Sequence, residues 1–371
     1  MNFETQDLVR AAKRDNNPKR PYLLVNPTQG KHIPVMPHAA LALFETLADA
    51  VRAAIPAGEP GLVIAFAETA TAIGAAIAAA LPGAVYFMQT TRAHVPDTAS
   101  LYFSETHSHA TEQRLCTRDL DRILPKVRHI VFAEDEVTTG NTILHLIDAL
   151  RARYALEHVG LGVASLLNGM TPESWQVYQD KGIWIRYLLA TDNAQVAADA
   201  ARFAADGDRF AVQYAHSLQA RRAQQPGLVD PRCVCAAEAY CSACGALARR
   251  AVQLVPKDAA RVLVLGTEEC MYAGLIAGLV LERAGHDVRF HATTRSPILT
   301  DKDPVYPLHA RWELRSLYDP ARVTYVYNLD AYDHVCVVTD ARTPEAGLQT
   351  LLAALEQAGN RSVSVLEWRQ A

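Results

Sequence analysis

Residues 131–142, with the sequence VFAEDEVTTGNT, hold the side chains best suited to chemistry in this chain of 371 residues. Their order predicts an apolar strand, two acidic residues and a Thr-Thr-Gly turn that opens a helix from Ile143. Backbone N–H groups at a helix N-terminus, helped by hydroxyls, bind phosphate. Gly140 permits the tight turn and a close approach of the backbone. The groups that would hold the phosphate belong to Val137, Thr138, Thr139, Gly140, Asn141 and Thr142.

The acidic residues Glu134 and Asp135 predict a second binding site beside the first. Their carboxylates would repel a phosphate, so they must face another group, and a ribose diol is the natural partner. A phosphate and a diol at the two ends of one loop describe a ribose 5-phosphate. The alternative is an ordinary acid-rich turn between a strand and a helix.

This segment resembles the substrate loop of the type I phosphoribosyltransferases, in which an apolar strand, two acids, two variable residues, Ser/Thr-Thr-Gly and then Ser/Thr follow one another. The resemblance implies 5-phosphoribosyl 1-pyrophosphate (PRPP) with Mg²⁺ as substrate, the ion being held by PRPP and by Glu134 and Asp135. It also implies transfer of phosphoribose to a small-molecule acceptor and release of pyrophosphate. Some purine enzymes of the family have an acid where this chain has Thr138, so the acceptor stays open.

The same resemblance assigns roles outside the loop. A loop that binds pyrophosphate is expected after the strand at 61–66, and a hood over the substrate at 93–114, with Arg92, His107 and His109 as catalytic groups. A plain connector and solvated histidines are the alternatives. The expected pyrophosphate-binding residues are Lys31, Ala67, Glu68, Thr69 and Ala70.

A closer resemblance covers nearly the whole chain. The motifs GKHIPV (30–35), FAETAT (66–71), HSHA (107–110), EDEVTTGNT and TRSP (294–297) are similar to those of phosphoribosyltransferases with a C-terminal domain named after that TRSP tetrapeptide. Genes of this subfamily typically lie in tellurite-resistance-type operons, which implies a biosynthetic role in nucleotide metabolism. The competing hypothesis is a regulatory protein of the same fold that senses PRPP or a nucleotide without catalysis. The expected hood favours an enzyme.

Short apolar runs alternate with longer amphipathic stretches and must position these loops. The runs predict an α/β fold with a mostly parallel sheet. We expect a phosphoribosyltransferase domain at 1–225, a linker at 226–237 and a C-terminal TRSP domain at 238–371, with residues 194–224 an alanine-rich helical stretch. The expected strands lie at 22–25, 61–66, 84–88, 129–133, 159–166, 184–189, 262–265, 287–291, 323–327 and 334–339.

The C-terminal block reads as a degenerate duplicate of the first. The run LVIAFAE at 62–68 recurs as VLVLGTE at 262–268, and Thr-Thr-Arg recurs at 90–92 and 293–295. The phosphate turn is missing after Asp340, so this copy should not bind PRPP in the same way. Arg295 and Ser296 would complete an acceptor site or an interface, or Arg295 would be a structural ion-pair partner.

Four of the seven cysteines lie close together in sequence. Their thiolates could form a tetrahedral zinc site, although four ligands this close would crowd one metal ion. Reduced, unligated thiols are the alternative. These residues are Cys233, Cys235, Cys241 and Cys244.

The composition limits the classes of partner that this protein could bind. With 36 basic and 40 acidic residues the formal net charge is −4, which argues against nucleic-acid or membrane binding as the main function. The uncharged stretch 69–91 is cut by Pro82 and Gly83 and therefore predicts a helix and a strand rather than a membrane span. The polar N-terminus predicts the cytoplasm. The resemblance implies a homodimer, unless the second block replaces the partner within one chain.

Overall fold

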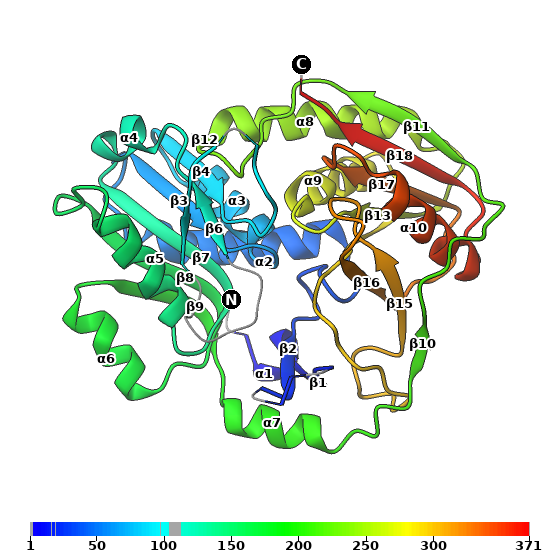
Figure 1. The fold of residues 1–371 in the computed structure, drawn as a ribbon, viewed down its shortest axis with the longest axis horizontal. Coiled ribbons are helices and arrows are strands. Elements are labelled where there is room, and N and C mark those ends of the chain that lie inside the picture. Colours follow the sequence, from blue (N-terminus) through cyan, green and yellow to red (C-terminus); the bar gives the residue numbers. More distant parts are fainter. Residues whose placement is uncertain (1–2, 16, 19, 97, 104–112, 371) are drawn as a thin grey trace. The chain divides into compact units, whose positions relative to one another are not determined.

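The computed structural model describes residues 3–370 except 16, 19, 97 and 104–112, and its path is coloured along the sequence in Figure 1. The chain forms two compact units. The first consists mainly of residues 44–191 and 229–242, and the second of residues 4–43, 192–228 and 243–371.

The first unit is built on a six-stranded sheet whose order is β12-β4-β3-β7-β8-β9. Every neighbouring pair is parallel except β12 and β4. The strands are β3 (Gly61–Ala65), β4 (Val85–Gln89), β7 (His129–Val137), β8 (Gly160–Asn168), β9 (Trp184–Ala190) and β12 (Cys235–Ala236); β5 (Ser100–Tyr102) and β6 (Arg114–Cys116) form a separate hairpin. Its helical segments are α3 (Thr71–Ala80), α4 (Leu120–Ile123), η1 (Leu124–Lys126), α5 (Asn141–Arg151) and α6 (Pro172–Asp180).

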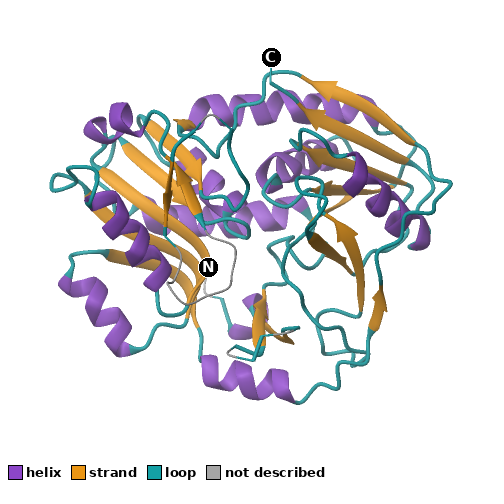
Figure 2. Cartoon of the chain, in the orientation of Figure 1, coloured by secondary structure: helices purple, strands orange, loops and turns teal. Residues whose placement is uncertain are grey.

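The apolar runs form the centre of this sheet because both of its faces are covered. All five residues of β3 are buried, and α3 packs against β3, β4 and β7 (Figure 2). A Cβ atom on Gly74 of α3 would lie 2.5 Å from the Cβ of Ala65, so glycine here allows close packing of helix and sheet. The uncharged stretch 69–91 forms α3 and β4, as predicted. No helix within the described part of the chain is long and apolar enough to span a bilayer.

The second unit contains a five-stranded parallel sheet of order β11-β18-β17-β13-β14 and a three-stranded sheet of order β10-β15-β16. The N-terminal hairpin of β1 (Arg10–Lys13) and β2 (Tyr22–Val25) also belongs to this unit. The remaining strands are β10 (Asp208–Phe210), β11 (Ala220–Gln225), β13 (Arg261–Gly266), β14 (Asp287–Ala292), β15 (Ala310–Arg315), β16 (Val323–Tyr327), β17 (His334–Thr339) and β18 (Val363–Trp368). The helices are α1 (Thr5–Leu8), α7 (Asn193–Ala201), α9 (Met271–Arg283) and α10 (Glu345–Gln357), while α2 (Pro37–Arg52) and α8 (Ala237–Leu254) each contain a boundary between the units.

The two parallel sheets repeat one arrangement. The order β4-β3-β7-β8 in the first unit matches β14-β13-β17-β18 in the second, and α9 packs against β13, β14 and β17 as α3 does against their counterparts. The backbone N–H of Ala67 donates to Thr90 Oγ1 at 2.8 Å, and that of Glu268 donates to Thr293 Oγ1 at 2.9 Å. Shared hydrogen bonds at the repeated motifs support duplication of one α/β unit.

Each compact unit combines segments that are not contiguous in sequence, and the expected division at 1–225, 226–237 and 238–371 stays a prediction. Residues 4–43 lie in the second unit, where Ala12, Leu23 and Val25 pack into a core with Ile298 and Tyr327. Residues 22–25 were expected to form a strand. They form β2, which pairs with β1 outside the parallel sheet.

The expected helical stretch at 194–224 is wrong beyond its first part. Helix α7 ends at Ala201, and residues 220–225 instead form β11 at the edge of the second sheet. Each residue of β11 has a partner on β18, from Ala220 with Val363 to Gln225 with Trp368. The ladder of backbone hydrogen bonds thus outweighs the helix propensity of the alanines.

Candidate functional site

The two acidic residues lie within a strand rather than after it. Strand β7 was expected to end at residue 133, but it continues to Val137 because β8 pairs with it as far as Val137 with Asn168. Glu134 pairs with Ser165 and Glu136 with Leu167 on β8, and the side chains of Glu134 and Asp135 lie close enough to interact. The acidic pair is therefore held by a rigid element at the carboxyl end of the sheet.

The surroundings of Glu134 disfavour the ionised form of its carboxyl group. Burial raises its pKa well above the usual range, and the neighbouring charges of Asp135 and Glu136 raise it further. One opposing contact is the backbone N–H of Asp135, which lies 3.3 Å from Glu134 Oε2. A hydroxyl donor or a cation brought to this position would stabilise the ionised form.

The turn after β7 has the geometry expected for an anion site. Gly140 adopts φ +75°, the left-handed conformation, and is the N-cap residue of α5. The N-cap glycine has no side chain to cap α5, and the Oγ1 of Thr139 accepts the backbone N–H of Asn141 at 3.4 Å. Thr138 is half-buried and Thr139 exposed, next to these backbone N–H groups. The helix thus begins with N–H groups suited to a phosphate.

Tyr178 on α6 contacts this turn, and the sequence did not identify Tyr178 as a residue of the site. Its hydroxyl donates to the carbonyl oxygen of Gly140 at 2.7 Å, and its side chain is fully buried. Burial, followed by the nearby charge of Glu134, raises the pKa of Tyr178. A Cβ atom on Gly140 would lie 2.4 Å from the Tyr178 oxygen, so this contact also requires glycine. The pairing spans 38 residues, and no local motif signals it.

The expected pyrophosphate loop follows the neighbouring strand β3. Ala65 pairs with Ala133 of β7, so this loop and Glu134 begin at the same edge of the sheet. Ala67 donates to Thr90 Oγ1, and the peptide between Ala67 and Glu68 is cis. The structure therefore places Ala67, Glu68, Thr69 and Ala70 beside the strand that carries the acidic pair.

The other expected site residues have separate locations. Arg92 directly follows Thr91, whose backbone forms a bridge with Arg114 in the same unit. Lys31 belongs to the second unit, where it is buried and its Nζ donates to the carbonyl oxygens of Glu268 and Thr293 at 3.1 and 3.0 Å. Its expected pyrophosphate contact stays a prediction. His107 and His109 lie outside the described residues.

In the second unit, ion pairs occupy the equivalent edge of the duplicated sheet. Arg295 binds Glu268 at 2.7 Å and Glu269 at 3.2 Å, and Arg322 lies 3.3 Å from Glu268. Both glutamates are buried. Arg295 thus forms ion pairs within the second unit, and its expected role in an acceptor site or an interface stays a prediction. Ser296 is half-buried and donates its backbone N–H to Thr294 Oγ1 at 3.1 Å.

The expected zinc site is not formed. Among the described residues, which include all seven cysteines, no three His, Cys, Asp or Glu side chains are placed to hold a metal ion. Cys233 instead has its sulfur 2.7 Å from that of Cys116, and Cys235 donates to the carbonyl oxygen of Phe87. Cys235 belongs to β12, which pairs with β4 of the first sheet. It therefore does not join a cluster of four cysteine ligands, as the sequence suggested.

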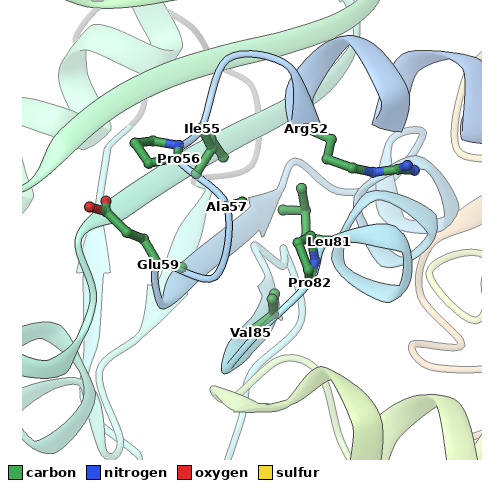
Figure 3. A pocket seen from close by; sticks show the side chains of 9 residues that line it. Arg52, Ile55, Pro56, Ala57, Glu59, Leu81, Pro82 and Val85 are labelled. Atoms are coloured by element: carbon green, nitrogen blue, oxygen red, sulfur yellow. The ribbon is translucent and has the colours of Figure 1, made fainter.

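A pocket of the first unit lies at the opposite end of the sheet (Figure 3). Its lining includes Gly61 and Val85, the first residues of β3 and β4, whereas the acidic pair lies near the carboxyl end of β7. Arg52, Pro56 and Pro82 complete its wall. This pocket is therefore separate from the expected substrate loops.

Comparisons with known proteins gave matches to solved structures and to family models. Solved structures similar to the chain include adenine phosphoribosyltransferase from Rhodothermus marinus (13% identity, 50% of this chain and 96% of that chain, TM-score 0.33). They also include the Giardia lamblia enzyme complexed with 9-deazaadenine (14%, 50% and 96%, 0.34). A third is a hypothetical protein from Neisseria gonorrhoeae with bound ppGpp (16%, 47% and 97%, 0.27). TM-scores this low do not bear on the substrate of this chain.

Two family models match the chain. A phosphoribosyl transferase model matches residues 8–191, and a model of the TRSP domain that lies C-terminal to that transferase domain matches residues 235–355. No curated protein matches significantly. The two matches occur in the order that the second model describes. The chain therefore belongs to the phosphoribosyl transferases that carry a TRSP domain at their C-terminus.

Proposed function

We propose that the protein transfers 5-phosphoribose from PRPP to a small-molecule acceptor and releases pyrophosphate, as a cytoplasmic enzyme. One observation carries the proposal: the acidic end of β7 leads through Gly140, with φ +75°, directly into the N-terminus of α5, beside the hydroxyls of Thr138 and Thr139. This juxtaposition offers acceptors for a ribose diol and donors for a 5-phosphate on one short segment. Family membership supports the transferase class.

In this proposal the chain's own residues mainly position the substrate. The N–H groups from Val137 to Thr142 hold the 5-phosphate, while Glu134 and Asp135 accept hydrogen bonds from the ribose hydroxyls. Their negative charge also stabilises the positive charge that develops on the anomeric carbon as pyrophosphate departs. The loop at 67–70 and Arg92 bind the leaving pyrophosphate, and closure of the 93–114 segment excludes water.

Magnesium fits this donor set. The carboxylates of Glu134 and Asp135 offer the hard oxygen ligands that Mg²⁺ prefers, and their mutual repulsion favours a cation between them. One or two carboxylates and substrate phosphates are the usual ligands of Mg²⁺ in such sites. Bound magnesium supplies positive charge that neutralises the departing pyrophosphate.

The acceptor meets no carboxylate at the position of Thr138, and a threonine hydroxyl is a poor general base. The acceptor therefore ionises unaided or uses another base. His107 and His109, which lie outside the described residues, are the proposed candidates. A homodimer is proposed as the assembly.

Calorimetric titration of PRPP with Mg²⁺ tests the proposal. We expect binding in the micromolar range by the wild type and its loss in the double variant Asp135→Asn/Thr139→Ala. The matched control is Glu157→Gln, an exposed residue of the same unit, which should bind as the wild type does. Absence of binding by folded wild-type protein would refute the proposed substrate.

A second measurement separates an enzyme from a sensor. Pyrophosphate release is followed while candidate acceptors are added to protein saturated with PRPP. Release that depends on both an acceptor and the intact loop supports transfer. Tight binding without release in the presence of any acceptor favours the regulatory alternative.

A further inference from the structure

Two cysteines far apart in sequence form a close pair in the first unit. Cys116, on β6, is fully buried, and Cys233 is 9% exposed. Their sulfur atoms lie 2.7 Å apart, well inside the 3.5–4.0 Å usual between non-bonded carbon atoms. A disulfide requires about 2.05 Å, so the two sulfurs need to approach by only about 0.6 Å. Only Val95 packs with them in a small apolar cluster of described residues.

The surroundings make the two thiols unequal. The hydrogen bond from Cys233, opposed by burial, lowers the pKa of Cys116, and the nearby Arg118 lowers it further. The same hydrogen bond and burial raise the pKa of Cys233. Arg118 is held in place by Thr98, whose Oγ1 accepts its Nη2 at 2.5 Å. A thiolate beside a thiol is the arrangement of a reactive cysteine with a resolving partner.

Each cysteine follows a segment that hydrogen-bonds to the end of β4 or to the residues just after it. Gln89 donates its backbone N–H to the carbonyl oxygen of Pro231 at 2.7 Å, two residues before Cys233. The backbones of Thr91 and Arg114 exchange hydrogen bonds of 2.9 and 3.0 Å, two residues before Cys116. A bond between the sulfurs would link these two segments covalently beside residues 89–91, a link that we call the clasp.

We propose that Cys116 and Cys233 are a redox modification site, which peroxide converts into a reversible disulfide. The Cys116 thiolate attacks one oxygen of hydrogen peroxide and becomes a sulfenic acid as hydroxide leaves. The Cys233 thiol then attacks that sulfur, a disulfide forms, and water departs. Overall two thiols lose two electrons and two protons, and one peroxide becomes two waters. This site is independent of the transfer reaction proposed above.

Mass spectrometry of the full-length wild type tests the proposal directly. The protein is treated with stoichiometric hydrogen peroxide, unfolded, alkylated and digested without reductant. We expect the peptides of Cys116 and Cys233 to be linked, and dithiothreitol to restore both as alkylated thiols. The proposal is overturned if both are alkylated after peroxide treatment, if Cys116 accumulates as sulfinic acid, or if either pairs mainly with another cysteine.

Hydrogen exchange adds a readout that does not depend on variants folding. Oxidation should slow amide exchange in peptides that cover residues 87–92 and 114–118, while β17 in the other unit serves as the unaffected reference. In Cys233→Ser the slowing should disappear, and in the matched variant Cys235→Ser it should persist. Equal exchange before and after oxidation of the wild type would contradict the clasp.

Discussion

Glu134→Gln should stabilise the protein at neutral pH, although it alters a residue of the proposed substrate site. Burial and the neighbouring carboxylates raise the pKa of Glu134 in the folded chain. A carboxyl group of this kind binds its proton more tightly when folded. Folding stability therefore falls as the pH rises from the unfolded pKa to the folded pKa. Glutamine has no charge to lose, and its side-chain oxygen can still accept the N–H of Asp135.

The magnitude is limited by the pH interval. Each unit of pKa elevation corresponds to about 1.4 kcal/mol. Between the usual value of 4.5 and an assay at pH 7, the penalty carried by Glu134 is at most about 3.5 kcal/mol. We expect a gain of about 1–3 kcal/mol for the variant at pH 7, shrinking toward zero below pH 4.5, where the carboxyl group is protonated in both states.

Urea unfolding followed by circular dichroism, from pH 4 to pH 7.5, measures this difference. Glu157→Gln removes an exposed carboxylate of the same unit and is the matched control, with an expected change within about 0.5 kcal/mol. A Glu134→Gln protein that is no more stable than the wild type at pH 7, or whose gain is the same at every pH, would refute the electrostatic reasoning. Either result would mean that ionisation of Glu134 does not destabilise the folded chain.

Three further predictions concern the same elements, each measured by urea unfolding. Gly140→Ala should lower the free energy of unfolding clearly more than Gly182→Ala. Both glycines have positive φ, which costs an alanine about 1–2 kcal/mol, but only at Gly140 would the new Cβ atom also clash with the Tyr178 oxygen. Equal losses would argue against that contact. Tyr178→Phe should lower the free energy of unfolding by about 0.5–1.5 kcal/mol, because the carbonyl oxygen of Gly140 loses one of its two donors and keeps the N–H of Leu144 at 3.1 Å; an unchanged midpoint would contradict a stabilising role of the Tyr178 hydroxyl. Arg295→Ala should cost about 3 kcal/mol because it leaves buried Glu268 and Glu269 short of a partner, whereas Arg261→Ala at an exposed pair should cost under about 1 kcal/mol; similar losses would contradict the burial argument.

The sequence determined the features whose causes are local. Apolar runs marked β3, β4, β7, β8 and β9 of the first sheet and β13, β14 and β17 of the second, but not β11, β12 or β18. The repeated motifs at 62–68 and 262–268 marked the duplication. The turn at Gly140 was also evident, because the order of acids, threonines and glycine describes a ligand site on one continuous segment. Such signals survive in sequence since a strand, a turn and a helix start depend on neighbours a few residues away.

Only the tertiary structure decided which distant segments meet. Residues 220–225 form β11 because they pair with the edge of β18, which no local pattern reveals. Cys233 faces Cys116 rather than a zinc ion, and Tyr178 supports Gly140, through contacts that span 117 and 38 residues. Likewise, the ion pairs of Arg295 follow from the packing of the second sheet. The sequence specifies which groups are available, but burial and pairing across the fold decide which of them become partners.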